Sequence, residues 1–292
     1  MNQSISAFGK TYSFSSKGAE LISAIDLNSK FEFIWQADPQ VWPRHAPILF
    51  PIVGKLKNNE YNWNQQVYTL PQHGFARDLN FEIQELYTDL ISFKLESNAE
   101  TKTNYPFDFC LMITYQALEN GLHMAIQIQN KSDFDMPFSF GLHPGFNLPE
   151  ANLDKYEIVA DHEMNWLTEK LANGLLTGEN QLLAESLQNI PLNPESFKND
   201  ALVFKQFNSS YIELKHKHNS FSVRVDTSQF PFLGIWNKYP NQSFICLEPW
   251  AGIADSVNTN SEFEDKEGIL NLEAGQTKTF ETFYELHAAS IV

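Results

Sequence analysis

The sequence has few basic residues. Its 292 residues include 20 Lys and Arg against 36 Asp and Glu, which gives a formal net charge of −16. A surface this negative repels the phosphates of nucleic acids and the head groups of anionic lipids. We therefore expect neither nucleic acid nor a membrane as a partner, and we attribute the acidity itself to solubility.

Cysteine is also scarce, because the chain has only Cys110 and Cys246. Both lie in apolar runs, which predicts buried free thiols in a reducing compartment rather than a disulfide framework. The N-terminus lacks the basic and apolar regions of a signal peptide, and no segment approaches the apolar length of a membrane span. We expect a cytoplasmic protein.

Helical periodicity and nucleotide-binding motifs are largely missing as well. The chain contains no G-x-S-x-G elbow, no Walker A loop and no G-x-G-x-x-G fingerprint. The stretch 169–188 has helix-forming residues but is interrupted by Gly174 and Gly178. We interpret it as a loop with short turns.

Alternating apolar and polar residues dominate instead. Stretches 91–97, 123–130 and 221–226 have the period of two that is typical of half-buried antiparallel strands. In stretch 109–130 two such runs flank Asn120-Gly121, a pair that favours a type I′ hairpin turn. Many short strands without a dividing linker predict one all-β domain over residues 1–292, a large antiparallel β-sandwich.

Two titratable side chains lie in apolar surroundings. Glu248 ends the run FICL, where a carboxylate is costly unless it is paired, so it is either a base with a shifted pKa or a cap on a neighbouring turn. His143 lies in FSFGLHPGF and is either a structural histidine or an acid–base group held near neutral pH.

Other polar residues could converge on a ligand. His73 and Arg77 flank a turn at Gly74, and Arg77 could bind hydroxyls, a carboxylate or a phosphate, or else pair with a surface acid. Lys55 ends an apolar run and is either a ligand contact or plain surface charge. Asp200 precedes a short strand and is either a ligand contact or a turn residue.

A metal site is a further alternative. His73, His143 and Glu248 could form a two-histidine, one-carboxylate zinc set. Their wide spacing in the sequence neither supports nor excludes it, and we favour acid–base use with no metal and no cofactor.

Five motifs together resemble the aldose 1-epimerase, or galactose mutarotase-like, superfamily, and in particular its LacX-type branch. They are FPIVGKLKNNEY, QHGFARD, MPFSFGLHPGF, NDALVF and LEPWAGIAD, which occur in the order of the family between residues 44 and 255. The resemblance implies a β-supersandwich that binds its sugar on a concave sheet face. This agrees with the alternation of the strands.

The resemblance also implies roles for individual residues. His143 matches the general acid that protonates the ring oxygen of the sugar, and Glu248 matches the general base that accepts the proton of the C1 hydroxyl. His73 matches the histidine that helps to polarise the ring oxygen. Asp200 matches a hydroxyl-binding aspartate.

Three more residues are expected at the sugar. Arg77 matches an arginine that lies near a bound anion in the sugar-phosphate branch of the superfamily. Lys55 falls where many relatives carry an arginine, so the charge is kept but the bidentate fork is lost. Trp236 could stack on a sugar face, as could Trp250, for which core packing is an equal alternative.

The expected function is therefore interconversion of the α and β anomers of a hexose or related aldose, by a monomer or homodimer that acts on a small-molecule sugar. Two alternatives stay open. One is a hexose-6-phosphate mutarotase, and the other is a non-catalytic sugar-binding or sensing protein on the same fold.

Overall fold

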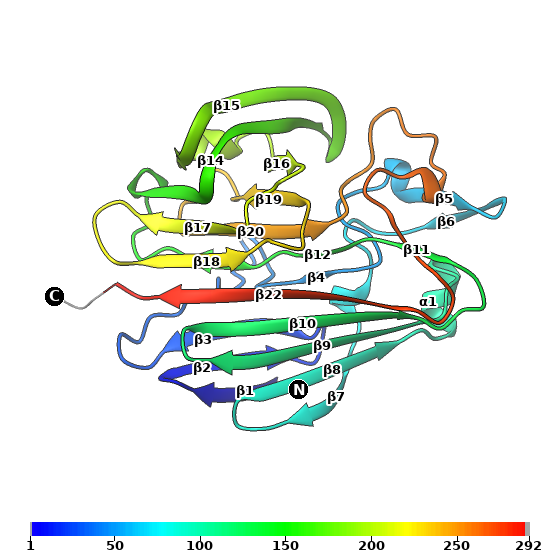
Figure 1. Ribbon diagram of the computed structural model, residues 1–292, viewed down its shortest axis with the longest axis horizontal. Helices are drawn as coiled ribbons and strands as arrows, with labels where there is room; N and C mark the ends of the chain where they lie inside the picture. Colours follow the sequence, from blue (N-terminus) through cyan, green and yellow to red (C-terminus); the bar gives the residue numbers. More distant parts are fainter. Residues whose placement is uncertain (1, 290–292) are drawn as a thin grey trace.

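Antiparallel strands make up most of the fold, as the alternation predicts. The computed structural model describes residues 2–289. The N-terminal sheet consists of β1 (Asn2–Ala7), β2 (Lys10–Ser15) and β3 (Glu20–Asp26). It lies beside one half of a much larger sheet (Figure 1).

The largest sheet has fifteen strands. Thirteen follow one hydrogen-bonded path, in the order β4 (Ile48–Leu49), β12 (Phe140–Leu142), β20 (Phe244–Ala251), β19 (Phe232–Trp236), β16 (Leu202–Lys205), β14 (Tyr156–Ala172), β17 (Tyr211–His216), β18 (Ser222–Asp226), β22 (Thr277–His287), β10 (Gly121–Asn130), β9 (Phe109–Leu118), β8 (Leu90–Glu96) and β7 (Glu82–Leu86). The other two are β13 (Gly145–Asn147), which pairs with β20, and β15 (Leu175–Pro191), which pairs with β14.

The remaining elements are short. Two further sheets pair β5 (Glu60–Trp63) with β6 (Gln66–Thr69) and β11 (Met136–Phe138) with β21 (Leu270–Leu272). The helical elements are α1 (Ala99–Asn104), η1 (Lys57–Asn59), η2 (Ala76–Asp78), η3 (Leu153–Lys155), η4 (Pro194–Phe197) and η5 (Phe263–Asp265). Within residues 2–289 there is no helix whose length and apolar character would let it cross a membrane.

Aromatic side chains join the two sheet layers. The ring of Phe14 on β2 packs against Phe93 on β8 and Tyr115 on β9, at centroid distances of 6.2 and 4.5 Å. The Tyr115 hydroxyl also donates to the carbonyl of Ala19, at 2.8 Å. Aromatic edges and faces that interlock in this way bury large apolar areas. The structure thereby confirms the predicted β-sandwich architecture.

The β9–β10 hairpin is confirmed, but its turn is displaced by one residue. Gly121 pairs with Leu118, so Glu119 and Asn120 close the turn and Gly121 already lies in β10. The glycine is required for a different reason from the expected positive φ. A Cβ atom at Gly121 would lie 1.8 Å from the carbonyl oxygen of Tyr284 on the neighbouring β22.

The prediction of a loop over 169–188 is wrong. This stretch belongs to β14 and β15, which form a long hairpin at one end of the molecule (Figure 1). Asn173 and Gly174 have φ angles of 53° and 79°, so they make the turn of the hairpin rather than interrupting regular structure. Most of β15 is exposed and its pairing with β14 shifts register several times, which removes the apolar alternation.

Candidate active site

A cavity of about 410 Å³ lies in the part of the large sheet that is formed by β14, β16, β19 and β20. Ligand pockets in proteins typically hold about 300–1,000 Å³. The cavity is lined by both polar and apolar residues, namely Val41, Trp42, Pro43, Gly54, Gln72, His73, Arg77, His143, Leu171, Gly174, Leu176, Asp200, Ala201, Val203, Trp236, Lys238, Glu248, Trp250, Ile253 and Ala254.

Strand pairing brings His143 to Glu248. His143 connects β12 to β13, and both strands pair with β20, through Gly141 with Trp250 and through Gly145 with Cys246. The histidine therefore lies opposite the stretch of β20 that carries Glu248. Its Nε2 atom is 3.2 Å from Oε2 of the glutamate.

Burial sets the protonation of this pair. The exposed fraction is 8% for His143 and 1% for Glu248. Burial, with a smaller contribution from the Arg77 guanidinium, lowers the pKa of His143 to about 3. Burial, together with the nearby Asp200 carboxylate, raises the pKa of Glu248 well above its ordinary value. Burial therefore favours the neutral form of both groups, which does not support an imidazole poised near neutral pH.

Two polar atoms of the His143–Glu248 pair form no hydrogen bond with any of residues 2–289. These are Nδ1 of His143 and Oε2 of Glu248. A buried polar atom without a partner is costly, and such atoms concentrate where a ligand binds. The pair is therefore suited to receive polar groups of a ligand.

His73 lies at the same cavity, in the turn that Gly74 makes possible. Its Nδ1 accepts a hydrogen bond from the Gly54 amide at 3.2 Å, and burial lowers its pKa well below the ordinary value. The neutral ring then carries its proton on Nε2. The atom 3.4 Å from it is Nε2 of Gln72, which is also a donor, so this proton remains available to a ligand. His73 is thus a neutral hydrogen-bond donor near His143, with ring centroids 5.5 Å apart.

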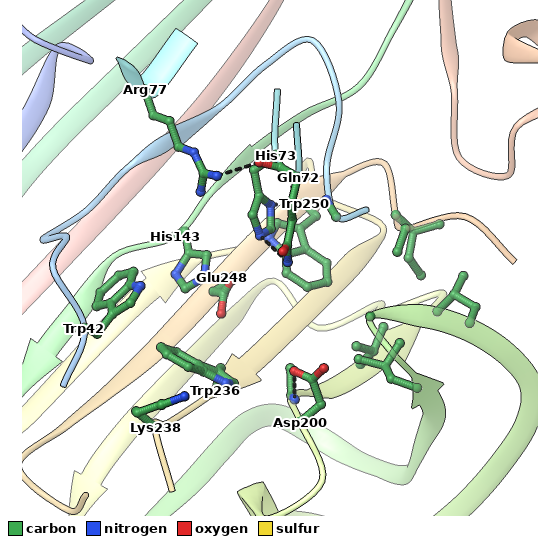
Figure 2. A pocket seen from close by; sticks show the side chains of 18 of the residues that line it. Trp42, Gln72, His73, Arg77, His143, Asp200, Trp236, Lys238, Glu248 and Trp250 are labelled. Carbon is green, nitrogen blue, oxygen red and sulfur yellow. Dashed lines mark hydrogen bonds and ion pairs between the residues drawn. The ribbon is translucent and has the colours of Figure 1, made fainter. Parts of the chain in front are cut away.

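Arg77 places a cation at one side of the cavity (Figure 2). Its Nη2 donates to the carbonyl of Gln72 at 2.5 Å, and its Nε lies 3.7 Å from Oδ2 of Asp78. Burial and the neighbouring Arg44 lower the pKa of Arg77 to about 10, so the guanidinium stays charged at neutral pH. No hydrogen bond from this Nε to residues 2–289 is formed.

Asp200 and Lys238 line the opposite side (Figure 2). Asp200 has a φ angle of 154°, a region that is sparsely populated for residues other than glycine and is found mainly at functional sites. One oxygen, Oδ1, accepts from the Ala201 amide at 2.8 Å. Burial raises the pKa of this carboxyl group.

Aromatic side chains form the walls around the pair. Trp42 stacks on the imidazole of His143, with centroids 4.9 Å apart and planes at 26°. Trp236 approaches the same imidazole edge-on at 5.8 Å. Both tryptophans therefore hold His143 in place and keep water from one side of it. Trp250 lines the cavity and also packs into a buried apolar cluster, so its core packing is confirmed and its stacking on a sugar stays a prediction.

Lys55 is not brought to the cavity. Its Nζ instead donates to the carbonyl of Asn173 at 3.2 Å, which ties it to the turn of the β14–β15 hairpin. The side chain is held there because the hairpin turn offers a carbonyl acceptor. The expected contact between Lys55 and the sugar is therefore not supported, whereas His73, Arg77, Asp200 and Trp236 all line the cavity.

Among the polar and aromatic lining residues, sequence reasoning missed three, namely Trp42, Gln72 and Lys238. Gln72 and Lys238 stand one and two residues from His73 and Trp236, so their proximity to recognised positions was an available signal. Trp42 had no such signal, because its contact with His143 joins residues far apart in the chain.

Possible metal ligands also differ from the expected set. Donor atoms of His143, Cys246 and Glu248 lie within 4.8 Å of one another, and His73 does not belong to this group. The thiol of Cys246 is fully buried beneath the aromatic walls. Cys110 is buried as well, so both cysteines are the free buried thiols that the sequence predicts.

Comparison with known proteins identifies the family. The model of the family described as aldose 1-epimerase matches residues 4–285. The chain belongs to the aldose 1-epimerase family. The chain is also similar to the plasmid and chromosomal LacX proteins of Lactococcus lactis subsp. lactis. Each is 30% identical to it over 277 residues, which cover 90% of this chain and 91% of LacX.

Two solved structures share the fold over nearly the whole length. A galactose mutarotase related enzyme from Lactobacillus acidophilus is 36% identical, with a TM-score of 0.95 over 99% of this chain and 98% of that one. A galactose mutarotase-like protein from Lactobacillus casei is 28% identical, with a TM-score of 0.93 over 98% of this chain and 100% of that one. The chain therefore has the galactose mutarotase-like fold of these two proteins.

Proposed function

We propose that the chain is an aldose 1-epimerase that interconverts the α and β anomers of a hexose or related aldose. The observation that carries the proposal is the buried His143–Glu248 pair, with Nε2 and Oε2 3.2 Å apart at the cavity. Family membership supports the same reaction class.

The reaction needs one proton donor and one proton acceptor at neighbouring sugar oxygens. As the C1–O5 bond breaks, its electron pair goes to the ring oxygen, which takes a proton from His143. Glu248 takes the proton of the anomeric hydroxyl, whose oxygen becomes that of the aldehyde. Rotation about C1–C2 and reclosure, with both proton transfers reversed, give the other anomer. Each positioned proton transfer contributes about 10²–10⁴-fold in rate.

The pair itself holds the one proton that this reaction requires. With His143 neutral and Glu248 protonated, as their shifted pKa values favour, the pair has one titratable proton. Its transfer from Glu248 to His143 across 3.2 Å produces the acid and the base. A ring oxygen that accepts from the imidazolium and an anomeric hydroxyl that donates to the carboxylate stabilise that charged arrangement.

Surrounding residues orient the sugar in this proposal. His73 donates to the ring oxygen from Nε2, Asp200 accepts from hydroxyl groups, and Trp236 packs against an apolar face of the ring. These three roles are supported by the position of the residues, because all three line the cavity around the His143–Glu248 pair.

Anomer exchange measured by NMR tests the proposal. The purified protein is mixed with pure α-glucose, α-galactose and other aldoses, and the approach to anomeric equilibrium is compared with that of His143→Ala and Glu248→Ala. We expect the wild type to exceed both variants by at least about 10²-fold on one sugar. Rates equal to those of the variants across the panel would refute catalysis, and sugar binding without exchange would establish the binding protein instead.

Arg77 favours a phosphorylated sugar as a second candidate substrate. Its half-buried guanidinium lines the cavity with Nε free of hydrogen bonds to residues 2–289, and a guanidinium fork matches phosphate geometry. The same exchange assay with hexose 6-phosphates decides between the two. If Arg77→Ala raises KM for the phosphorylated sugar and leaves KM for the free sugar unchanged, Arg77 holds a phosphate. Equal KM values for both sugars would oppose this candidate.

A further inference from the structure

Cys246 has no role in the acid–base reaction, although its thiol is close to both reacting groups. It precedes Glu248 by two residues on β20, so both side chains leave the same face of the strand. Cys246 also pairs with Gly145, two residues beyond His143. The three side chains consequently converge, with a nitrogen, a sulfur and a carboxylate oxygen all within 4.8 Å of one another.

The spacing of these atoms is close to that of zinc ligands. Zinc binds nitrogen and oxygen at about 2.0–2.2 Å and sulfur at about 2.3 Å, so two ligands of a tetrahedral ion stand roughly 3.3–3.8 Å apart. Nε2 of His143 and Oε2 of Glu248 are already 3.2 Å apart. The sulfur lies within 4.8 Å of both donors and would have to move closer to them to coordinate the same ion.

Hydrogen bonding also supports a ligand at this position. Although Oε2 of Glu248 lies 3.2 Å from Nε2 of His143, it accepts no hydrogen bond in the described part of the chain, and the side chain that carries it is 2% exposed. Coordination by a cation would satisfy this oxygen. A thiolate and a carboxylate together neutralise a divalent ion, which suits a site where burial disfavours net charge.

We infer that His143, Cys246 and Glu248 form a site for a thiophilic divalent cation of the Zn²⁺ type, which blocks the acid–base pair when it binds. Sulfur and imidazole donors select Zn²⁺ over Mg²⁺ or Ca²⁺, which prefer oxygen. Three protein ligands leave the fourth position of the ion for water. The ion acts as a reversible inhibitor because it occupies the lone pairs that would otherwise exchange protons with the sugar.

Binding is balanced by the release of protons. The thiol gives up one proton to become a thiolate, and a protonated Glu248 gives up a second, while neutral His143 gives up none at the atom that coordinates.

Direct metal binding is the primary test, and it does not depend on sugar turnover. Tag-free protein is titrated with Co²⁺ and followed by absorption spectroscopy, then with Zn²⁺ by calorimetry. We expect one ion per chain, with the visible bands of tetrahedral cobalt and a thiolate-to-cobalt charge-transfer band in the near ultraviolet. Absence of the charge-transfer band in the wild type would overturn the inference.

Three variants assign the sulfur ligand. Cys246→Ala and Cys246→Ser should both lose the charge-transfer band and bind Zn²⁺ at least tenfold more weakly, and the near-isosteric serine preserves packing if alanine impairs folding. Cys110→Ala is the matched control, because it removes the other buried thiol of the chain and should bind as the wild type does. Wild-type affinity in both Cys246 variants would exclude this thiol as a ligand.

Inhibition is the second test, and it rests on the proposed epimerase activity. Zn²⁺ should slow anomer exchange by the wild type and by Cys110→Ala, and at least tenfold more Zn²⁺ should be needed for Cys246→Ser, each measured relative to its own zinc-free rate. Metal binding without anomer exchange would refute the proposed function and leave the site established. Exchange by the wild type that is indifferent to bound Zn²⁺ would refute the blocking role.

Discussion

Replacement of Glu248 by glutamine should abolish activity and stabilise the protein at the same time. The carboxyl group is 1% exposed and its Oε2 lacks a hydrogen-bond partner within residues 2–289. Loss of the base should slow anomer exchange by about 10²–10⁴-fold, or roughly 2.7–5.5 kcal/mol of transition-state free energy. Glutamine has nearly the same shape, so packing is preserved.

The sign of the stability change follows from the raised pKa of Glu248. In the window between the unfolded and folded pKa values the folded state binds more protons, so the free energy of unfolding of the wild type falls as pH rises. Glutamine removes this dependence. The variant Glu248→Gln should therefore have a higher free energy of unfolding than the wild type. This difference should begin near pH 4.3, which is about the pKa of glutamate in the unfolded chain, grow with pH, and level off above the pKa of Glu248 in the folded protein. The amide is as buried as the carboxyl group that it replaces, so the gain comes only from the removed ionisation of Glu248.

Urea unfolding across a range of pH values measures the gain. Glu169→Gln is the matched control, because Glu169 is also buried but accepts from Lys205 Nζ at 2.6 Å and from the Gly178 amide at 2.8 Å. It should lose about 1.5–3 kcal/mol. If Glu248→Gln is instead less stable than the wild type at neutral pH, Glu248 is the ionised partner of a His143 imidazolium, and the neutral pair described above is refuted.

Four further outcomes are expected. An NMR titration of the His143 imidazole should show no transition near the ordinary histidine pKa of about 6.5, because burial lowers the pKa of His143 to about 3; a clear transition there would contradict this assignment. Trp42→Leu should raise the pKa of that imidazole in an NMR titration, whereas Trp42→Phe keeps a stacked ring and should leave it nearly unchanged. Arg77→Ala should raise KM by about 10–100-fold on its preferred substrate while Lys55→Ala changes KM less than about twofold, since only Arg77 lines the cavity; equal effects would contradict the placement of Lys55. Lys266→Met should lower the free energy of unfolding by about 3–5 kcal/mol in urea, because Asp255 would lose a buried ion partner at 3.7 Å, and an unchanged midpoint would rule the ion pair out as a stabilising contact.

Local patterns predicted the parts of the fold in which one face of a strand is buried. β10 alternates buried and more exposed residues, and its sequence shows the same period. The long β14–β15 hairpin escaped prediction because β15 is mostly exposed and so carries no apolar alternation. The role of Gly121 was mispredicted for a related reason. A glycine is required there because β22 passes close to it, and β22 is far from Gly121 in the sequence.

The candidate site also has features that the local sequence predicted and features that depend on distant strand pairing. His143 and Glu248 could be found because a titratable side chain within an apolar run is visible locally. Their 3.2 Å separation, and the pKa shifts that burial imposes, depend on the pairing of β12 and β13 with β20. For Lys55 the local sequence was misleading. Its position in a motif predicted a contact with the sugar, whereas its Nζ donates to the carbonyl of Asn173 in the turn of the β14–β15 hairpin.

Burial of the acid–base pair is compatible with the proposed reaction because that reaction consumes no proton. Ring opening moves one proton onto the ring oxygen and another off the anomeric hydroxyl, and reclosure returns both. The His143–Glu248 pair therefore ends each cycle with the one proton with which it began, so exchange with bulk water is not needed between turnovers. A pair that had to be recharged from solvent would require a group that titrates near neutral pH. In an epimerase the geometry of the pair matters more than a matched pKa, and the stacked Trp42 and the strand β20 are what fix that geometry here.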